Sequence, residues 1–178
     1  MGAESNRKTE TRRVNEARLT SLYDEYYNKI AHYAFVRIGD RTEAEDLAGE
    51  VFLKALESLK SYEERGIPMQ AWLFRIAHNL VVDHLRKAAK RKTVSIDTVQ
   101  IEAEADPVAL ADRNIELEKV AGAMEQLTSE QREVLRLRFF GGLTSKEAGS
   151  ILKKSDGAVR EMQRAAVEKL RRLLVTDH

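Results

Sequence analysis

The sequence contains no cysteine, which excludes disulfide bonds and thiolate metal sites. It also has no apolar run near the roughly 20 residues needed to span a bilayer. The first thirteen residues mix acids, bases and polar side chains without an apolar core, so they do not have the pattern of a secretory signal. We therefore expect a cytoplasmic protein with no membrane insertion.

Net charge is nearly absent, at +1, but the charges are unevenly placed. Residues 84–92 carry bases and no acid, whereas residues 93–118 carry many acids against Arg113 alone. Each run could be an ordinary solvated surface. The alternative is a basic helix end, suited to phosphate, that leads into an acidic connector.

Helix signals dominate the rest of the chain, so we predict an all-α fold. Thr42, Thr128 and Thr144 are each followed three residues later by Glu or Gln, the pattern of a capping box at a helix start. After Thr42, apolar residues recur at helical spacing through Leu59, and the preceding helix is expected to stop near Gly39.

The region around residues 93–113 has no amphipathic period, contains Pro107 and is rich in acids, as is typical of an extended linker. A structureless segment of that length is unusual inside one compact domain. We therefore predict a disordered tail (1–17), a helical domain (18–92), an acidic linker (93–113) and a second helical domain (114–178).

The helix after Pro68 carries two stripes. Leu73, Ala77 and Val81 belong to an apolar stripe that we expect to be buried. The second stripe is aromatic at one end and hydrogen-bonding along its length, and it steps by three or four through Trp72, Arg75, Asn79, Asp83 and Arg86. It suits a nucleic-acid strand; the alternative is that Trp72 is core and the others are solvated surface.

Two short helices joined by a tight corner, within residues 143–167, form the pattern of a helix-turn-helix. The small residues Ala148 and Gly149 would allow the next helix to approach closely. Ser155, Arg160, Gln163 and Arg164 remain outward and can donate to base edges and phosphates in a major groove. A purely structural helix-turn-helix would leave this outward set unexplained.

Catalytic patterns are missing from the sequence. The four histidines show no metal-ligand spacing, and neither a phosphate-binding loop nor a nucleophile elbow occurs. We therefore predict no enzyme activity, no metal and no cofactor. Two alternatives to a protein that contacts DNA through both helical domains remain. One is a transcription regulator with an N-terminal sensor or partner-binding domain, and the other is a helical scaffold that does not bind DNA.

Four stretches in order resemble the extracytoplasmic-function (ECF) sigma factors of the sigma-70 superfamily. They are residues 22–27 (LYDEYY), 44–56 (AEDLAGEVFLKAL), 71–83 (AWLFRIAHNLVVD) and 127–139 (LTSEQREVLRLRF). The resemblance covers roughly residues 22–174 and implies a region 2-like domain followed by a region 4-like helix-turn-helix domain.

The resemblance implies three sites in this chain. The clamp of core RNA polymerase would dock on Asp46, Glu50, Phe52 and Leu53. The melted non-template strand of a minus-ten promoter element would contact Tyr62, Trp72, Arg75, Asn79, Asp83, Arg86, Lys87 and Lys90, with Tyr62 in the loop that captures a flipped base. The minus-thirty-five element would be read as duplex by Thr144, Lys146, Ser155, Arg160, Gln163 and Arg164.

Further partners follow from the same resemblance, namely the polymerase flap and an anti-sigma factor. Four residues depart from the family pattern, among them Lys154, which is of an exposed type where relatives commonly have an apolar residue. Lys153 occupies the corner where relatives often place glycine, at a cost of roughly 1 kcal/mol if the backbone is left-handed. Gly49 weakens the docking helix by up to about 1 kcal/mol. Glu161 puts an acid beside the presumed DNA face.

Overall fold

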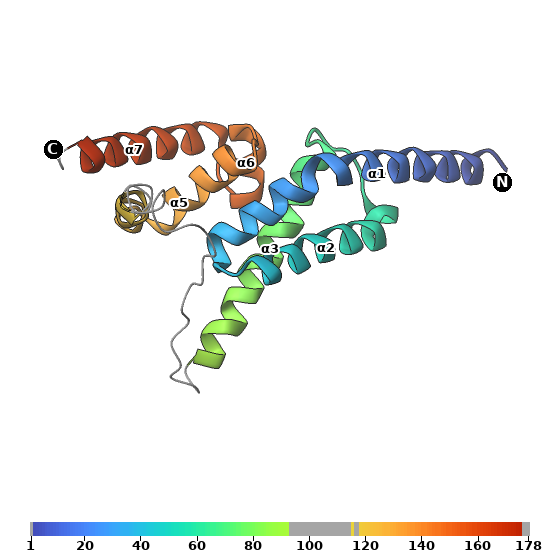
Figure 1. Ribbon diagram of the computed structural model, residues 1–178. Coiled ribbons are helices and arrows are strands. Elements are labelled where there is room, and N and C mark those ends of the chain that lie inside the picture. Colours follow the sequence, from blue (N-terminus) through green and yellow to red (C-terminus); the bar gives the residue numbers. More distant parts are fainter. Residues whose placement is uncertain (1, 93–114, 116–117, 176–178) are drawn as a thin grey trace. The chain divides into compact units, whose positions relative to one another are not determined.

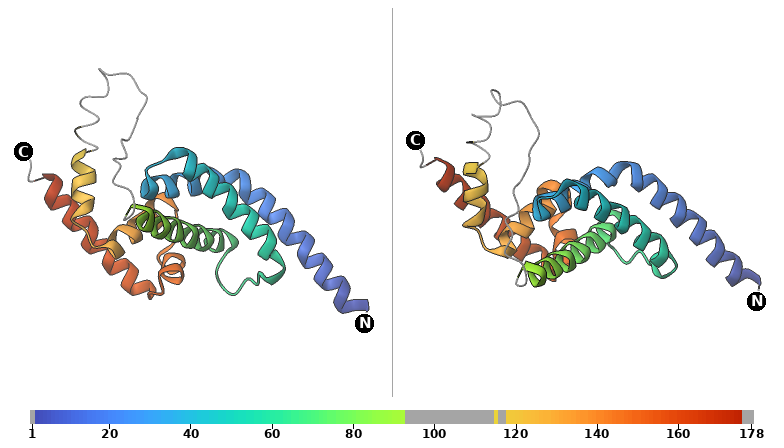
Figure 2. Two further views of the ribbon diagram at one scale, coloured as in Figure 1. Left: turned by 90° about the horizontal axis from the view of Figure 1, so that it is seen from below. Right: turned by 60° about the horizontal axis from the view of Figure 1, so that its bottom comes forward.

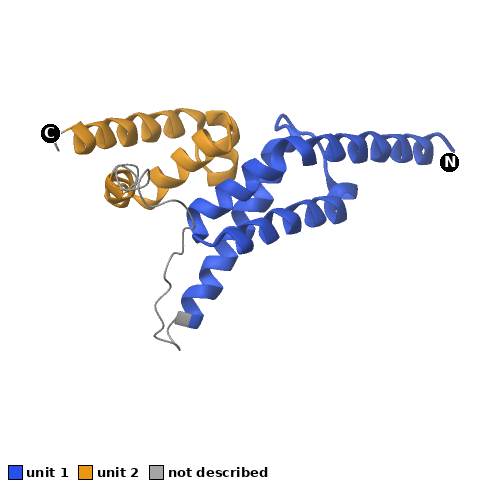
Figure 3. Ribbon diagram, viewed as in Figure 1, with its two compact units in different colours: residues 1–98 blue, residues 99–178 orange. Residues whose placement is uncertain are grey.

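The computed structural model describes residues 2–92, 115 and 118–175, and its regular structure in those regions is entirely helical. The chain divides into two compact units, Met1–Thr98 and Val99–His178 (Figure 3). The predicted all-α class is therefore confirmed. The predicted acidic linker, residues 93–113, lies outside the described residues. Within the described regions, no helix is both long and apolar enough to cross a membrane.

Unit 1 consists of α1 (Gly2–Ile38), α2 (Arg41–Ser58), a short 3₁₀ turn η1 (Leu59–Ser61) and α3 (Met69–Lys92). α2 runs back along the C-terminal part of α1, and α3 packs against both (Figure 1). The Phe74 ring lies edge-on to Tyr26 and Tyr33, with ring centroids 6.2 and 5.8 Å apart. Apolar side chains from all three helices are buried around it, among them Ile30, Ala48, Val51, Leu73, Ala77 and Val81.

The turn between α1 and α2 is held by its own backbone. Gly39 adopts φ 82°, and its N–H donates to the Phe35 carbonyl at 2.8 Å, so α1 stops where the sequence predicts. The α2 cap differs from the prediction. Asp40, and not Thr42, is the N-cap residue, and its side chain accepts from the Glu43 N–H at 2.8 Å. Because aspartate is a strong N-cap residue, the helix begins before Thr42 and leaves that residue inside its first turn.

The first part of α1 also corrects a prediction. Residues 2–17 form helix, not the disordered tail expected, and they project beyond the other helices of unit 1 (Figure 2). Residues 2–14 are exposed, and burial begins at Asn15 and Leu19. Once the packed part of α1 has nucleated a helix, each added residue needs no new nucleus. Good helix formers and the Arg12–Glu16 pair at 2.8 Å then favour extension.

Unit 2 contains a helical segment at residues 118–125, α5 (Ser129–Leu135), a π-helical turn η2 (Arg136–Phe140), α6 (Ser145–Leu152) and α7 (Asp156–Val175). The capping boxes predicted at Thr128 and Thr144 are both confirmed. Its core joins Leu127, Leu135 and Ala166, with Met124, Val167 and Leu170 packed against them. Helical spacing of apolar residues before Thr128 predicts a buried face that includes Val120, Ala121, Met124 and Leu127, but Val120 and Ala121 are exposed.

The corner between α6 and α7 is unusually tight. Lys153 caps α6 with φ 56° and ψ 44°, which is left-handed backbone, and the Lys154 N–H returns to the Gly149 carbonyl at 2.9 Å. A Cβ atom added at Gly149 would lie 2.5 Å from the Lys154 carbonyl oxygen. The expected close approach at Gly149 is therefore confirmed, and the chain uses a strained lysine to make the turn.

Candidate nucleic-acid interfaces

The polar stripe of α3 forms one continuous face. Arg75, Asn79 and Arg86 are exposed, whereas Trp72 and Asp83 are half-buried. Leu73, Ala77 and Val81 are buried on the side facing the other helices. The predicted division of α3 into two stripes is therefore confirmed, and the polar one is open to a ligand along several helical turns.

A hollow of about 430 Å³ opens at the N-terminal end of this stripe. Its aromatic wall is formed by Tyr62, from the loop after η1, and Trp72, whose ring centroids lie 4.7 Å apart at an interplanar angle of 42°. Two arginines, the acid Glu63, Ser61 and Ile67 complete the lining, which comprises Ser61, Tyr62, Glu63, Arg65, Ile67, Trp72 and Arg75. The hollow is of a size to admit one flat aromatic group against a ring wall.

The Tyr62 hydroxyl is part of the aromatic side chain that lines this hollow. It is buried and has no hydrogen-bond partner among the described residues. Burial, followed by the charge of Glu64, raises the pKa of Tyr62 above its ordinary value, whereas Arg18 lowers it. The phenol therefore stays protonated at neutral pH and keeps a proton to donate.

Further along α3, Asp83 organises two cations. Its carboxylate accepts from Lys87 at 2.9 Å and from Arg86. These hydrogen bonds, that of Lys87 being the larger influence, lower the pKa of Asp83. The carboxylate is therefore ionised and fixes where the two positive charges lie. Lys90 follows one turn later and is exposed, so the C-terminal part of α3 offers cations suited to a phosphate backbone.

The predicted docking residues lie on α2 but do not share one environment. Asp46 and Glu50 are exposed, and Leu53 is 62% exposed, so these three form an outward surface. Phe52 differs from the prediction, because it is only 7% exposed. Its ring packs against Tyr23 and Tyr27 of α1, with ring centroids 4.9 and 6.5 Å away. Phe52 therefore supports the outward surface from beneath.

The outward face of α7 carries arginines that already have acidic partners. Arg160 pairs with Asp156 at 3.1 Å. Arg164 lies between Glu161, at 2.8 Å, and Glu168, at 3.1 Å. The hydrogen bond from Arg164 lowers the pKa of Glu161, so this carboxylate is ionised at neutral pH. Both arginines are exposed, and their guanidinium groups are held along one side of the helix.

Arg138, which the sequence analysis did not select, also belongs to this face. Its Nε donates to the Gln163 amide oxygen at 2.8 Å, and its guanidinium donates to the Leu143 carbonyl. A shallow hollow of about 650 Å³ is lined by Arg138, Arg160, Gln163, Arg164, Val167, Glu168 and Arg171. A lining of four arginines and one acid has the charge that suits phosphate oxygens. A contact across 25 residues leaves no periodic signal in the sequence.

Two residues predicted to contact DNA serve as helix caps. The Thr144 hydroxyl accepts from the Glu147 N–H at 3.2 Å, and the Ser155 hydroxyl accepts from the Ala158 N–H at 3.1 Å. Each hydroxyl therefore uses one acceptor position to cap its helix and keeps its own O–H to donate. Lys146 is exposed, as predicted.

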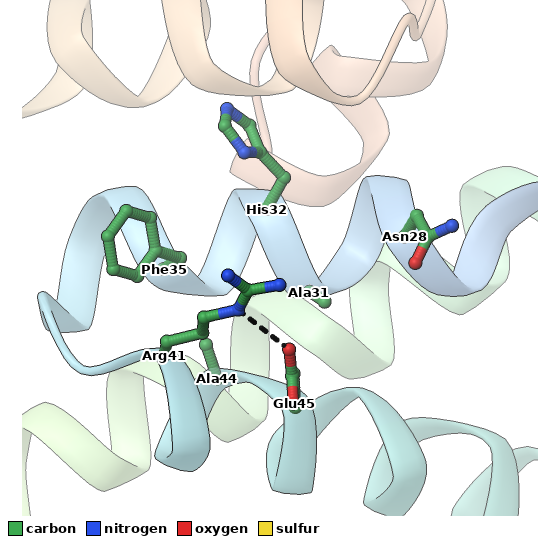
Figure 4. A pocket seen from close by; sticks show the side chains of 7 residues that line it. All are labelled: Asn28, Ala31, His32, Phe35, Arg41, Ala44 and Glu45. Atoms are coloured by element: carbon green, nitrogen blue, oxygen red, sulfur yellow. Dashed lines mark hydrogen bonds and ion pairs between the residues drawn. The ribbon is translucent and has the colours of Figure 1, made fainter. Parts of the chain in front are cut away.

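A separate hollow of about 350 Å³ lies between α1 and α2. Figure 4 shows the Arg41 side chain of α2 reaching toward Glu45, one turn along the same helix, to which its Nε donates at 3.0 Å, with Phe35 of α1 nearby. None of the predicted site residues lines it. In the described regions, no group of three or more His, Asp or Glu side chains is placed to hold a metal ion.

Comparison with known families matches both units. Residues 22–91 match the model for Sigma-70 region 2, and residues 123–172 match the model for Sigma-70, region 4. The first match contains α2, α3 and the Tyr62 loop, and the second contains the corner and most of α7. Both faces described above therefore lie inside matched regions.

Curated relatives align with most of the chain. It is 33% identical over 160 residues to the ECF RNA polymerase sigma factor BldN of Streptomyces coelicolor, covering 88% of this chain and 60% of that protein. It is 30% identical over 159 residues to SigL of Mycobacterium tuberculosis, covering 87% and 88%. SigX of Bacillus subtilis is 29% identical over 157 residues, covering 85% and 80%.

Solved structures show the same fold. CnrH, in complex with the cytosolic domain of CnrY, aligns with a TM-score of 0.67 and 24% identity over 96% of each chain. The sigma factor RpoE of Bartonella quintana, in complex with the anti-sigma factor NepR, aligns with a TM-score of 0.67 and 23% identity over 89% of this chain and 98% of that one.

Proposed function

On the premise that the chain belongs to the ECF RNA polymerase sigma factors, we propose that unit 1 opens a minus-ten promoter element and unit 2 reads a minus-thirty-five element. Membership makes the chain a promoter-specificity factor for transcription initiation and not an enzyme. The rival sensor-regulator and DNA-free scaffold are set aside by the same finding. We place its action in the cytoplasm, where the polymerase works.

The observation that carries the proposal is the pair of unlike nucleic-acid faces. α3 offers an aromatic wall, polar groups along one stripe and then cations, which is what an unstacked single strand requires. α7 offers outward arginines at the end of a helix-turn-helix, which is what a major groove requires. A protein that bound only duplex DNA would have no use for the first face.

Docking on core RNA polymerase is assigned to α2. Asp46 and Glu50 supply exposed carboxylates that can pair with arginines, and Leu53 supplies exposed apolar area beside them. The clamp is the partner that the family implies for this surface, and the flap is the partner for unit 2. An anti-sigma factor is a further partner that we expect, since the similar sigma factor RpoE has been solved in complex with one.

Run-off transcription with core RNA polymerase tests the proposal on promoters selected from a randomised library. We expect Asn79→Ala to fail mainly on closed templates and to recover on templates melted in advance at the minus-ten element. Arg160→Ala should lose activity on both templates when transcription depends on the minus-thirty-five duplex. Arg12→Ala, which changes an exposed arginine on another part of unit 1, is the control and should match the wild type.

The result against the melting role is equal loss by Asn79→Ala on both templates. Failure of the wild-type chain to bind core polymerase, or to confer any start-site selectivity, would remove the whole proposal.

A further inference from the structure

The loop that carries Tyr62 is tied to the long helix α1 by a bidentate ion pair. Arg18 Nη1 donates to one carboxylate oxygen of Glu64 at 2.9 Å, and Nη2 donates to the other at 3.4 Å. The two residues are 46 positions apart in the chain, so the pair joins separate elements. The pairing lowers the pKa of Glu64, which keeps the carboxylate ionised at neutral pH.

Both residues of this pair are well placed to hold the Tyr62 loop at a fixed position on α1. On α1, Arg18 directly precedes Leu19, which is buried, so the helix is anchored at that turn. In the loop, Glu64 is two residues after Tyr62 and two before Gly66, whose φ of 75° marks a sharp change of direction. The loop around Glu64 has no regular secondary structure of its own. The ion pair therefore limits where the Tyr62 ring can go.

The same pair acts on the hollow beside α3. Tyr62 stacks near Trp72, and its buried hydroxyl lies close enough to Arg18 and Glu64 for both charges to influence its pKa. Without the tie to α1, the loop that carries Tyr62 would have more freedom to move relative to Trp72, which is fixed on α3. Holding the wall in place before a ligand arrives removes an ordering cost from binding.

We propose that Arg18 and Glu64 are positioning residues that keep the Tyr62–Trp72 wall preformed to receive a nucleobase extruded from the minus-ten element. The inference rests on the proposed function and assigns this chain's own groups to one step of it, the capture of the extruded base. Neither side chain lines the hollow, so both act through Tyr62.

The test uses the full chain bound to core RNA polymerase and a promoter selected by that complex. Opening is followed by the fluorescence of 2-aminopurine placed in the melted region. A second set of templates replaces each base of the melted non-template strand, one at a time, by an abasic residue. The position whose loss most reduces opening by the wild type identifies the captured base.

Arg18→Ala and Glu64→Gln should each reduce opening of the intact promoter by about fivefold, the upper range for an exposed ion pair. On the template that lacks the captured base, neither variant should reduce opening any further, because the step they support no longer occurs. The double variant should be no worse than either single one. Exchanging the charges, with Arg18→Glu and Glu64→Arg together, should restore part of the loss.

Arg12→Ala is the matched control, because Arg12 and Glu16 form an exposed pair on the same helix that does not reach the loop. It should open every template as the wild type does. Since Arg18 and Glu64 are themselves 40% and 48% exposed, we expect all variants to fold.

Two results would overturn the inference. One is full opening of the intact promoter by Arg18→Ala, and the other is the same fold loss with and without the captured base, which marks a merely structural role. If the wild type itself opened no promoter, the proposed function would fall, and this inference with it.

Discussion

At the scale of single residues, the corner of the helix-turn-helix places a lysine where glycine is the easier choice. Lys153 is the one residue other than glycine with positive φ in the described parts of the chain. A Cβ atom in the left-handed region meets the following carbonyl, which costs roughly 1–2 kcal/mol. The backbone just after Lys153 passes close to Gly149, where an added Cβ atom would lie 2.5 Å from the Lys154 carbonyl oxygen.

Lys153→Gly should therefore stabilise unit 2, raising its free energy of unfolding by about 1 kcal/mol. Urea unfolding followed by circular dichroism measures this change. Lys153→Ala is the control, because alanine keeps the Cβ atom and should bring no such gain. A lower stability for Lys153→Gly would show that the lysine side chain makes a contribution larger than the strain.

Two helical glycines should respond in opposite ways to alanine. At Gly49, an added Cβ would meet nothing within 4 Å, so Gly49→Ala should raise the free energy of unfolding of unit 1 by about 0.5–1 kcal/mol. At Gly149, the added atom would collide with the Lys154 carbonyl, so Gly149→Ala should lower the free energy of unfolding of unit 2 by about 1–3 kcal/mol. Thermal unfolding of both variants checks the pair, and equal effects would contradict the structure.

At the scale of elements, the features predicted well are those with local signals. Thr128 and Thr144 were recognised from residues three positions apart, and the two stripes of α3 from helical periodicity. The N-cap of α2 was predicted at Thr42 and is Asp40, because two residues suited to capping lie only two positions apart. Leu56 fits the apolar period of α2, yet it is 55% exposed, so periodicity alone did not tell the buried from the exposed edge of this face.

Long-range contacts were beyond reach for a different reason. Arg18 meets Glu64, and Arg138 meets Gln163, only after separate elements have packed. Charged residues occur throughout the sequence, so nothing in the local pattern distinguishes these two arginines from the others. The candidate faces could be predicted from the sequence, but the groups that hold them in place could not.

The outward face of α7 contains an acidic residue, Glu161, among its arginines. Glu161 is exposed, ionised and bonded to Arg164, so it both repels phosphate and competes with DNA for that arginine. Glu161→Gln should raise affinity for the minus-thirty-five duplex by about threefold, as expected for removal of one exposed ion pair. Fluorescence anisotropy with a labelled duplex measures the change.

Glu125→Gln removes the same charge from the separate helical segment 118–125 and serves as the control. It should leave the affinity for the duplex close to that of the wild type. Weaker binding by Glu161→Gln would indicate instead that the carboxylate accepts a hydrogen bond from a base, as acidic side chains do with cytosine.

At the scale of the whole molecule, the net charge is only +1, but positive and negative side chains lie on different surfaces. The C-terminal part of α3 and the hollow beside α7 collect cations, while the outward surface of α2 presents Asp46 and Glu50. A near-neutral chain can therefore offer positive surfaces to nucleic acid and a negative one to a protein partner.

The carboxylates along α7 neutralise its arginines in the free protein, and this should change how DNA binding depends on salt concentration. When Arg160 and Arg164 turn to phosphates, Asp156 and Glu161 are left to recruit sodium or potassium from solution, which offsets part of the cation release that drives association. The logarithm of the binding constant should therefore fall with the logarithm of salt concentration, but with a smaller slope than expected from the number of arginines that contact phosphate. Asp156→Asn should steepen that line by up to about one unit, and an unchanged slope would mean the pairs survive on DNA.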